Sequence, residues 1–101
     1  MTGKLELLSV RPSAKPDKKL DAKFKTESGR EKTVSFGAKG MDDYTKTHDR
    51  DQRERYLERH GRGKENWSKP DSPGALSRWI LWGESTSMMA NLASFRRRFN
   101  L

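Results

Sequence analysis

Three short stretches in the first third of the chain have the residue pattern of β-strands. They are residues 4–10 (KLELLSV), 20–26 (LDAKFKT) and 32–36 (KTVSF), and the last two alternate apolar with polar positions. Between the first two, residues 12–19 (PSAKPDKK) contain two prolines and three lysines, which indicates a solvated loop. The first stretch is apolar on both faces, with Leu5 and Leu7 on one face and Leu8 and Val10 on the other.

The spacing between the second and third stretches allows two ways of pairing them. A two-residue turn would put Val34 on the face opposite to Phe24. A three-residue loop with Gly29 in the left-handed conformation puts the apolar residues of both strands on one face, and we expect this register. It pairs Ala22 with Val34, Leu20 with Phe36, and Thr26 with Arg30.

Residues 72–83 (SPGALSRWILWG) are the most apolar stretch and predict the helix around which the core is built. Ser72 is a candidate N-cap, Pro73 suits the first helical position, and Gly83 can end the helix in the left-handed conformation. Helical spacing predicts one buried face and places Leu81 and Trp82 at its flanks. The predicted face consists of Leu76, Trp79, Ile80 and Gly83.

Residues 48–60 (HDRDQRERYLERH) predict a charged surface helix. Asp49 is its candidate N-cap, Gly61 ends it, and the spacing of Asp51 and Arg55 suits an i, i+4 ion pair. Its apolar anchors are Tyr56 and Leu57. The preceding residues 37–47 (GAKGMDDYTKT) are expected to be irregular and to be anchored by Met41 and Tyr44.

A last helix is predicted after Ser85 or Thr86, either of which can cap it. Its apolar stripe consists of Met88, Met89, Leu92, Phe95 and Phe99. Strands followed by helices predict a single α+β domain over residues 1–101. In this domain a small antiparallel three-stranded sheet at the N-terminal end is packed by about three short helices.

Composition limits the core and the function. Only 31% of the residues are hydrophobic and 36% are charged, so the core must be small and rich in aromatic side chains. Lysine and arginine outnumber aspartate and glutamate by 22 to 14, and a net charge of +8 favours polyanionic partners. The chain has no cysteine, which excludes disulfides and thiol chemistry. We expect an intracellular protein without membrane contact, because no apolar run approaches the ~20 residues of a membrane span.

The residues that could support catalysis do not form a recognised pattern. His48 and His60 lie at opposite ends of one predicted helix, roughly 18 Å apart, and cannot share a metal ion. Asp42, Asp43, Asp49 and Asp51 lack the spacing of a catalytic magnesium site, and the sequence GAKG lacks the form of a P-loop. We therefore expect no enzymatic activity, no cofactor, no metal and no small-molecule substrate.

The basic residues are the strongest functional signal. Residues 96–98 (RRR) cover about 300° of a helix surface, so at least one guanidinium group must face away from the core. Polyanion contact and neutralisation of the helix C-terminus explain this run equally well. The candidate nucleic-acid-binding residues are Lys15, Lys18, Lys19, Lys23, Lys25, Lys32, Lys39, Arg96, Arg97 and Arg98.

The three tryptophans could stack on bases if they were exposed. Trp79 lies in the predicted apolar face and is assigned to the core. Trp82 at the flank of that face and Trp67 in a loop are candidate protein-contact residues.

Five segments carry a resemblance to a known family. They are FGAKGMDDYT, DQRERYLERH, ENW, PGALSRWILWG and FRRRFNL, in this order. With them, residues 32–101 resemble a family of small basic uncharacterised proteins of large nucleocytoplasmic DNA viruses, notably algal and giant viruses. The resemblance implies a viral source and presence in the virion or in the cytoplasm or nucleus of the infected host cell. It implies no catalytic motif and no ligand.

Two functions of different classes fit these observations. The first is a non-enzymatic protein that binds nucleic acid largely through phosphate contacts. The second is a minor capsid protein that cements capsid proteins by protein–protein contacts. A steep loss of duplex DNA affinity with rising salt would favour the first.

Overall fold

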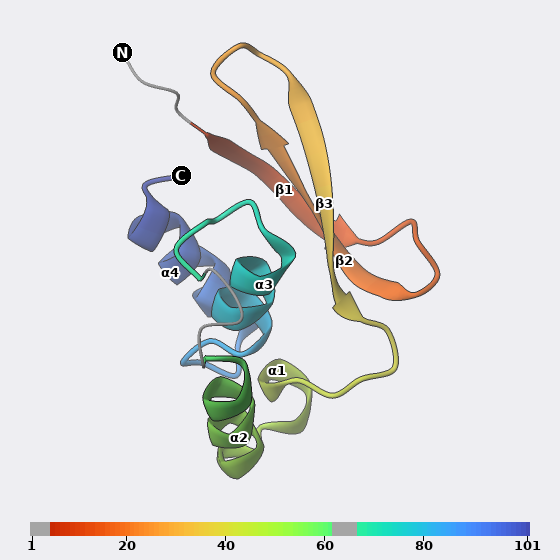
Figure 1. The fold of residues 1–101 in the computed structure, drawn as a ribbon, viewed down its shortest axis with the longest axis vertical. Helices are drawn as coiled ribbons and strands as arrows, with labels where there is room; N and C mark the ends of the chain where they lie inside the picture. Colours follow the sequence, from red (N-terminus) through yellow and green to blue (C-terminus); the bar gives the residue numbers. More distant parts are fainter. Residues whose placement is uncertain (1–4, 62–66) are drawn as a thin grey trace.

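The computed structural model describes residues 5–61 and 67–101 and consists of a three-stranded antiparallel sheet and a group of short helices (Figure 1). The strands are β1 (Glu6–Pro12), β2 (Lys18–Lys25) and β3 (Glu31–Ala38), in the order β1-β2-β3. The helices are α1 (Tyr44–Thr47), α2 (Arg50–His60), α3 (Pro73–Leu76), the π-helix η1 (Ser77–Leu81) and α4 (Met88–Phe99). The predicted α+β fold is therefore confirmed.

The hairpin of β2 and β3 has the predicted register. Its pairs are Ala22 with Val34, Leu20 with Phe36, and, across the loop, Thr26 with Arg30. Gly29 has a φ of 88°, as the three-residue loop requires. Phe24 and Phe36 consequently share one face of the sheet, and both are fully buried against the helices.

Replacing Gly29 with valine should lower the free energy of unfolding by about 1–2 kcal/mol, because a β-branched residue is strained at positive φ. A Cβ atom at this position would meet nothing within 4 Å, so no steric clash adds to the backbone strain. Chemical denaturation measures the loss. Ser28→Ala is the matched control, since Ser28 is exposed in the same loop and has a negative φ. Equal stability of the Gly29 variant and the wild type would show that the loop does not need a left-handed residue.

Strand β1 departs from the predicted alternation through a β-bulge at Leu8. On either side of the bulge Leu7 pairs with Phe24 and Val10 pairs with Ala22, so Leu7 and Val10 both face the core. The expectation that Val10 lies opposite to Leu7 is wrong, because the extra residue shifts the alternation by one position.

The centre of the core is formed by α3 and η1, which follow each other without a break. Ser72 caps this segment as predicted, since its Oγ accepts a hydrogen bond from the backbone N–H of Ala75 at 3.2 Å. In a π-turn the residues at i, i+4 and i+5 fall on one side, because the helix has more than four residues per turn. Leu76, Ile80 and Leu81 have this spacing, and each is at most 2% exposed.

Because of the π-turn, the buried positions within residues 72–83 differ from those predicted for a regular α-helix. Trp82 was expected at a flank with Leu81 but is only 8% exposed, whereas Trp79 is partly buried at the edge of the core. Gly83 does not adopt the expected left-handed conformation. It is needed for space instead, because a Cβ atom there would lie 2.6 Å from the Trp79 carbonyl oxygen and from the side chain of Asn91.

The two longer helices begin at residues whose side chains cap them. Asp49 caps α2 as predicted, since its Oδ1 accepts the backbone N–H of Gln52 at 3.1 Å. The cap of α4 is Ser87, not Ser85 or Thr86, so this helix begins slightly later than expected. No described helix is long and apolar enough to cross a membrane.

Three smaller expectations about the helical part are wrong. Met41 and Met89 were expected inside, but they are 63% and 78% exposed, while Tyr44 is buried as predicted. Asp51 and Arg55 do not form an ion pair in the described part of the chain.

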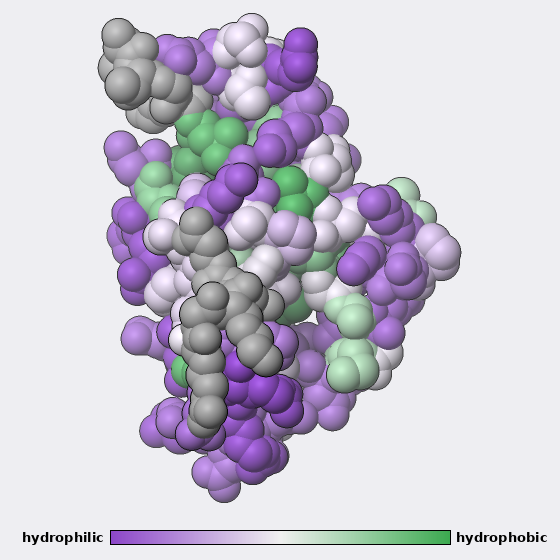
Figure 2. Space-filling model, in the orientation of Figure 1, coloured by the Kyte–Doolittle hydropathy of each residue, from purple (hydrophilic) through white to green (hydrophobic). Residues whose placement is uncertain are grey.

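Hydrophilic residues dominate the rim of the face seen in Figure 2, with small areas of hydrophobic residues between them.

Candidate nucleic-acid interface

Two of the ten predicted basic residues are neutralised within the fold. Lys19 donates a hydrogen bond from Nζ to the buried carboxylate of Asp43. Lys32 forms an ion pair with Asp71, with 2.8 Å between Nζ and Oδ2. Because each ammonium group already has a carboxylate partner, we leave both lysines out of the candidate interface.

Lys23 and Lys25 project from the face of the sheet that the core does not cover, and both are exposed. This face also carries acidic groups. Lys23 Nζ lies 3.4 Å from Glu31 Oε1, and Lys25 pairs in register with Glu6 on one side and Glu31 on the other. The positive charge of the two lysines is therefore largely offset.

Asp21 adds a further negative charge to the same open face. Its Oδ1 accepts hydrogen bonds from the hydroxyl groups of Ser13 and Ser35, each at 2.6 Å. These two hydrogen bonds lower the pKa of the Asp21 carboxyl group below its ordinary value. A carboxylate that stays ionised repels phosphate, so the open face of the sheet is a poor nucleic-acid interface.

Lys15, Lys18 and Lys39 lie together at the end of the sheet where the β1–β2 loop meets the exit of β3. Lys18 pairs with Ala38 in register, and the backbone N–H of Lys39 donates to the Asp17 carbonyl at 3.0 Å. None of the three ammonium groups has a carboxylate within 4 Å among the described residues. They form a small basic group that is separate from the arginine run.

The arginine run is divided between the fold and the solvent. Arg96 donates from Nη1 to the Leu7 carbonyl at 2.9 Å and so attaches α4 to β1. Arg97 and Arg98 are exposed. The guanidinium carbon of Arg98 lies 3.7 Å from the centroid of the Trp79 ring, which is a close cation–π contact.

Two arginines that the sequence pattern did not single out extend this contact: Arg78 shares the Trp79 ring with Arg98, and Arg53 shares a carbonyl with Arg78. The guanidinium carbon of Arg78 lies 4.1 Å from the same Trp79 ring centroid. Arg53 Nε and Arg78 Nη1 both donate to the Trp82 carbonyl, at 3.3 and 3.1 Å. Arg53, Arg78 and Arg98, which come from α2, η1 and α4, are called the arginine cluster below.

The arginine cluster has little negative charge to balance it. Burial is the main cause that lowers the pKa of Arg78 to about 10, and the positive charges of Arg53 and Arg98 lower it further. Within the described chain, the cluster's one ion pair joins Arg53 to Glu54 at 3.9 Å. The low pKa of Arg78 therefore reflects mainly its burial, whereas the charges of the two arginines and of Glu84 act on it in opposite directions.

Two of the three tryptophans are fixed by contacts within the domain. Trp82 stacks on Tyr56 with a centroid distance of 4.3 Å and an interplanar angle of 6°, so the expectation that it offers a protein-contact surface is wrong. Trp79 donates from Nε1 to the Trp67 carbonyl at 2.8 Å. Trp67 is partly buried with its ring 5.1 Å from the guanidinium carbon of Arg78, and its role in protein contact stays a prediction.

The histidines occupy structural positions in the helical part. His48 ends α1 in the left-handed conformation with a φ of 58°, and His60 stacks on Tyr56 at a centroid distance of 4.3 Å. No three side chains of histidine, cysteine, aspartate or glutamate gather as metal ligands in the part of the chain that the structure describes.

Comparison with curated proteins and with solved structures gives no match. One family model matches residues 8–60, which extend from within β1 to the end of α2 and make up slightly more than half of the chain. Helices α3, η1 and α4 lie outside the matched region. The chain therefore belongs to DUF5754, a family of unknown function.

Proposed function

We propose that this protein is a non-enzymatic nucleic-acid-binding protein that contacts phosphates through Arg78 and Arg98 of the arginine cluster and through the neighbouring Arg97. The observation that carries the proposal is uncompensated charge. In the described residues, no aspartate or glutamate lies within 4 Å of the guanidinium groups of Arg78, Arg97 or Arg98. Guanidinium groups form strong, often bidentate hydrogen bonds with phosphate, which makes a polyanion the fitting partner.

The expected contacts are to the backbone of the nucleic acid and not to its bases. Trp79 is the aromatic ring nearest to the exposed arginines, but it already contacts Arg78 and Arg98. We therefore expect this ring to position the two cations and not to stack on a base. Phosphate contacts carry no sequence information, so binding should be largely independent of sequence.

The proposed setting is a virion or the interior of an infected cell, where a viral genome would be the polyanion. The support for this setting is the resemblance of residues 32–101 to proteins of large DNA viruses.

A minor capsid protein is the second candidate function. It is favoured by the exposure of Met41 and Met89, because methionine is enriched where proteins contact each other.

The double variant Arg97→Gln, Arg98→Gln tests the proposed function. Titrations of random duplex DNA at several salt concentrations should give a slope of log affinity against log salt that is shallower by about 2 units, because two phosphate contacts are lost. The weakening should be similar on every sequence. The fold should persist, since both side chains are exposed and glutamine is a good helix former. Arg96 is left unchanged because it attaches α4 to β1.

A matched control removes two charges from the open face of the sheet. The double variant Lys23→Gln, Lys25→Gln should keep the slope of the wild type, because Asp21, Glu6 and Glu31 already offset these lysines. Equal slopes for the wild type and the arginine variant would refute the proposed interface. An absence of duplex binding by the wild type at low salt would favour the capsid function.

A further inference from the structure

A cavity of about 470 Å³ lies between the exit of β3, α2 and the segment of α3 and η1. This volume is in the range of sites that hold small ligands. Its lining includes the core residues Phe36, Leu81 and Trp82, which are at most 8% exposed. The exposed apolar residues Ala38 and Pro73 also line it. Met41 also lines it and is 63% exposed, so a flexible apolar side chain stands at its open side.

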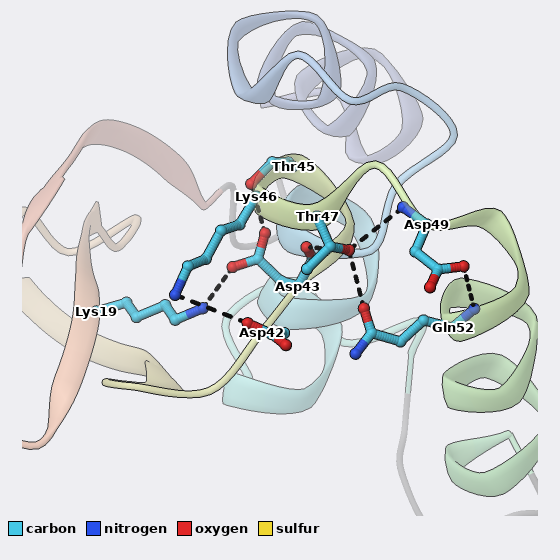
Figure 3. A network of polar contacts seen from close by, with 8 residues as sticks. All are labelled: Lys19, Asp42, Asp43, Thr45, Lys46, Thr47, Asp49 and Gln52. Atoms are coloured by element: carbon cyan, nitrogen blue, oxygen red, sulfur yellow. Dashed lines mark hydrogen bonds and ion pairs between the residues drawn. The ribbon is translucent and has the colours of Figure 1, made fainter.

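The acidic groups of this cavity already have partners (Figure 3). Asp43 accepts hydrogen bonds from Lys19 Nζ and from the Thr45 hydroxyl group. Asp42 Oδ1 lies 3.7 Å from Lys46 Nζ. Figure 3 shows Lys19 reaching from the sheet toward the segment that leads into α1, where the two carboxylates lie. Both negative charges are thus offset before any ligand arrives.

Two basic residues of the cavity have no such partner. Lys18 lines it from β2 and Arg59 lines it from α2. Neither has a carboxylate within 4 Å in the described residues. The cavity therefore combines an apolar wall with two uncompensated cations, a combination that suits a ligand with an apolar body and an anionic group.

We propose that this cavity binds a nucleotide, with its phosphate at Lys18 and Arg59 and its base against the exposed apolar residues Ala38, Met41 and Pro73. Arginine binds phosphate through bidentate hydrogen bonds and lysine binds it as a point charge, while an apolar surface suits the faces of a base. The ligand is either a free nucleotide or the 5′-phosphorylated end of a nucleic-acid strand. The site is separate from the arginine cluster. It differs from the sequence-based expectation that the protein has no small-molecule substrate.

Calorimetric titration of the full chain with AMP, adenosine and inorganic phosphate tests the proposal. AMP should bind, while adenosine and phosphate should each bind at least tenfold more weakly, because each lacks half of the recognised groups. Lys18→Gln and Arg59→Gln, tested singly, should each weaken AMP binding at least tenfold. Neither side chain has a hydrogen bond or ion pair in the described structure, so both variants should fold, as circular dichroism can verify.

The control is the double variant Arg97→Gln, Arg98→Gln, which should bind AMP as the wild type does even where its duplex binding is impaired. A short oligonucleotide with a 5′-phosphate distinguishes the two sources. If it binds more tightly than AMP, and if this binding is lost when a hydroxyl replaces the phosphate, the ligand is a strand end. Weaker binding than AMP identifies a free nucleotide. The proposal is overturned if neither AMP nor this oligonucleotide binds, or if Lys18→Gln and Arg59→Gln bind AMP like the wild type.

Discussion

Alanine in place of Asp43 is expected to lower the free energy of unfolding by about 3 kcal/mol, as measured by chemical denaturation. The side chain of Asp43 is 5% exposed and that of its partner Lys19 is 19% exposed. Removal of the carboxylate leaves a largely buried ammonium group without a counter-ion and the Thr45 hydroxyl without its acceptor. Such a broken buried pair costs far more than the intact pair contributes.

Two control variants separate the cost of an unpaired charge from other effects. Lys19→Met combined with Asp43→Leu removes both charges and should recover most of the lost stability, because nothing charged is left buried. Asp42→Ala breaks an ion pair whose members are 50% and 59% exposed, and it should cost less than about 1 kcal/mol. Equal losses for Asp42→Ala and Asp43→Ala would contradict the importance of burial.

The Lys19–Asp43 pair also shows why the predicted set of basic residues was too wide. In the sequence, Lys19 lies in a lysine-rich loop and is indistinguishable from Lys15 and Lys18. Its carboxylate partner is 24 positions away, and only the folded chain brings the two together. Sequence composition reports the total charge, whereas the availability of each charge depends on such long-range pairs.

The features that could be predicted are those whose cause is local. Alternation in residues 20–26 and 32–36 predicts two strands, which are β2 (Lys18–Lys25) and β3 (Glu31–Ala38) in the structure, and Gly29 fixes the length of their loop. Ser72 and Asp49 could be identified as caps because the hydrogen bond of a capping side chain spans only three residues.

The features that could not be predicted depend on packing between distant segments. The bulge at Leu8 and the π-turn of η1 each add one residue to a regular element, and a single sequence has no marker for such an insertion. The arginine cluster joins three helices. Of its three members the sequence pattern singled out only Arg98. A signal for Arg78 was present, because it is a charged residue inside the most apolar stretch of the chain.

Alanine in place of Trp79 should lower the free energy of unfolding by about 3 kcal/mol. This value is at the lower end of the cost of truncating a large aromatic side chain, because Trp79 is only partly buried. The variant loses the hydrogen bond to the Trp67 carbonyl, the edge contact with Phe99 and the ring on which Arg78 and Arg98 rest. For a domain of this size the melting temperature should fall by more than about 10 °C. A melting temperature within about 2 °C of the wild type would contradict the role of Trp79 in the core.

Trp79→Phe separates the ring from the hydrogen bond. Phenylalanine keeps an aromatic face for Arg78 and Arg98 but cannot donate to the Trp67 carbonyl, so it should cost only about 1 kcal/mol. If the ring positions Arg98 for phosphate, Trp79→Ala should make the salt slope of duplex binding shallower by about 1 unit below its melting temperature, and Trp79→Phe should not. A slope unchanged in Trp79→Ala would mean that Arg98 reaches phosphate without this ring, and the cation–π contact would then serve stability alone.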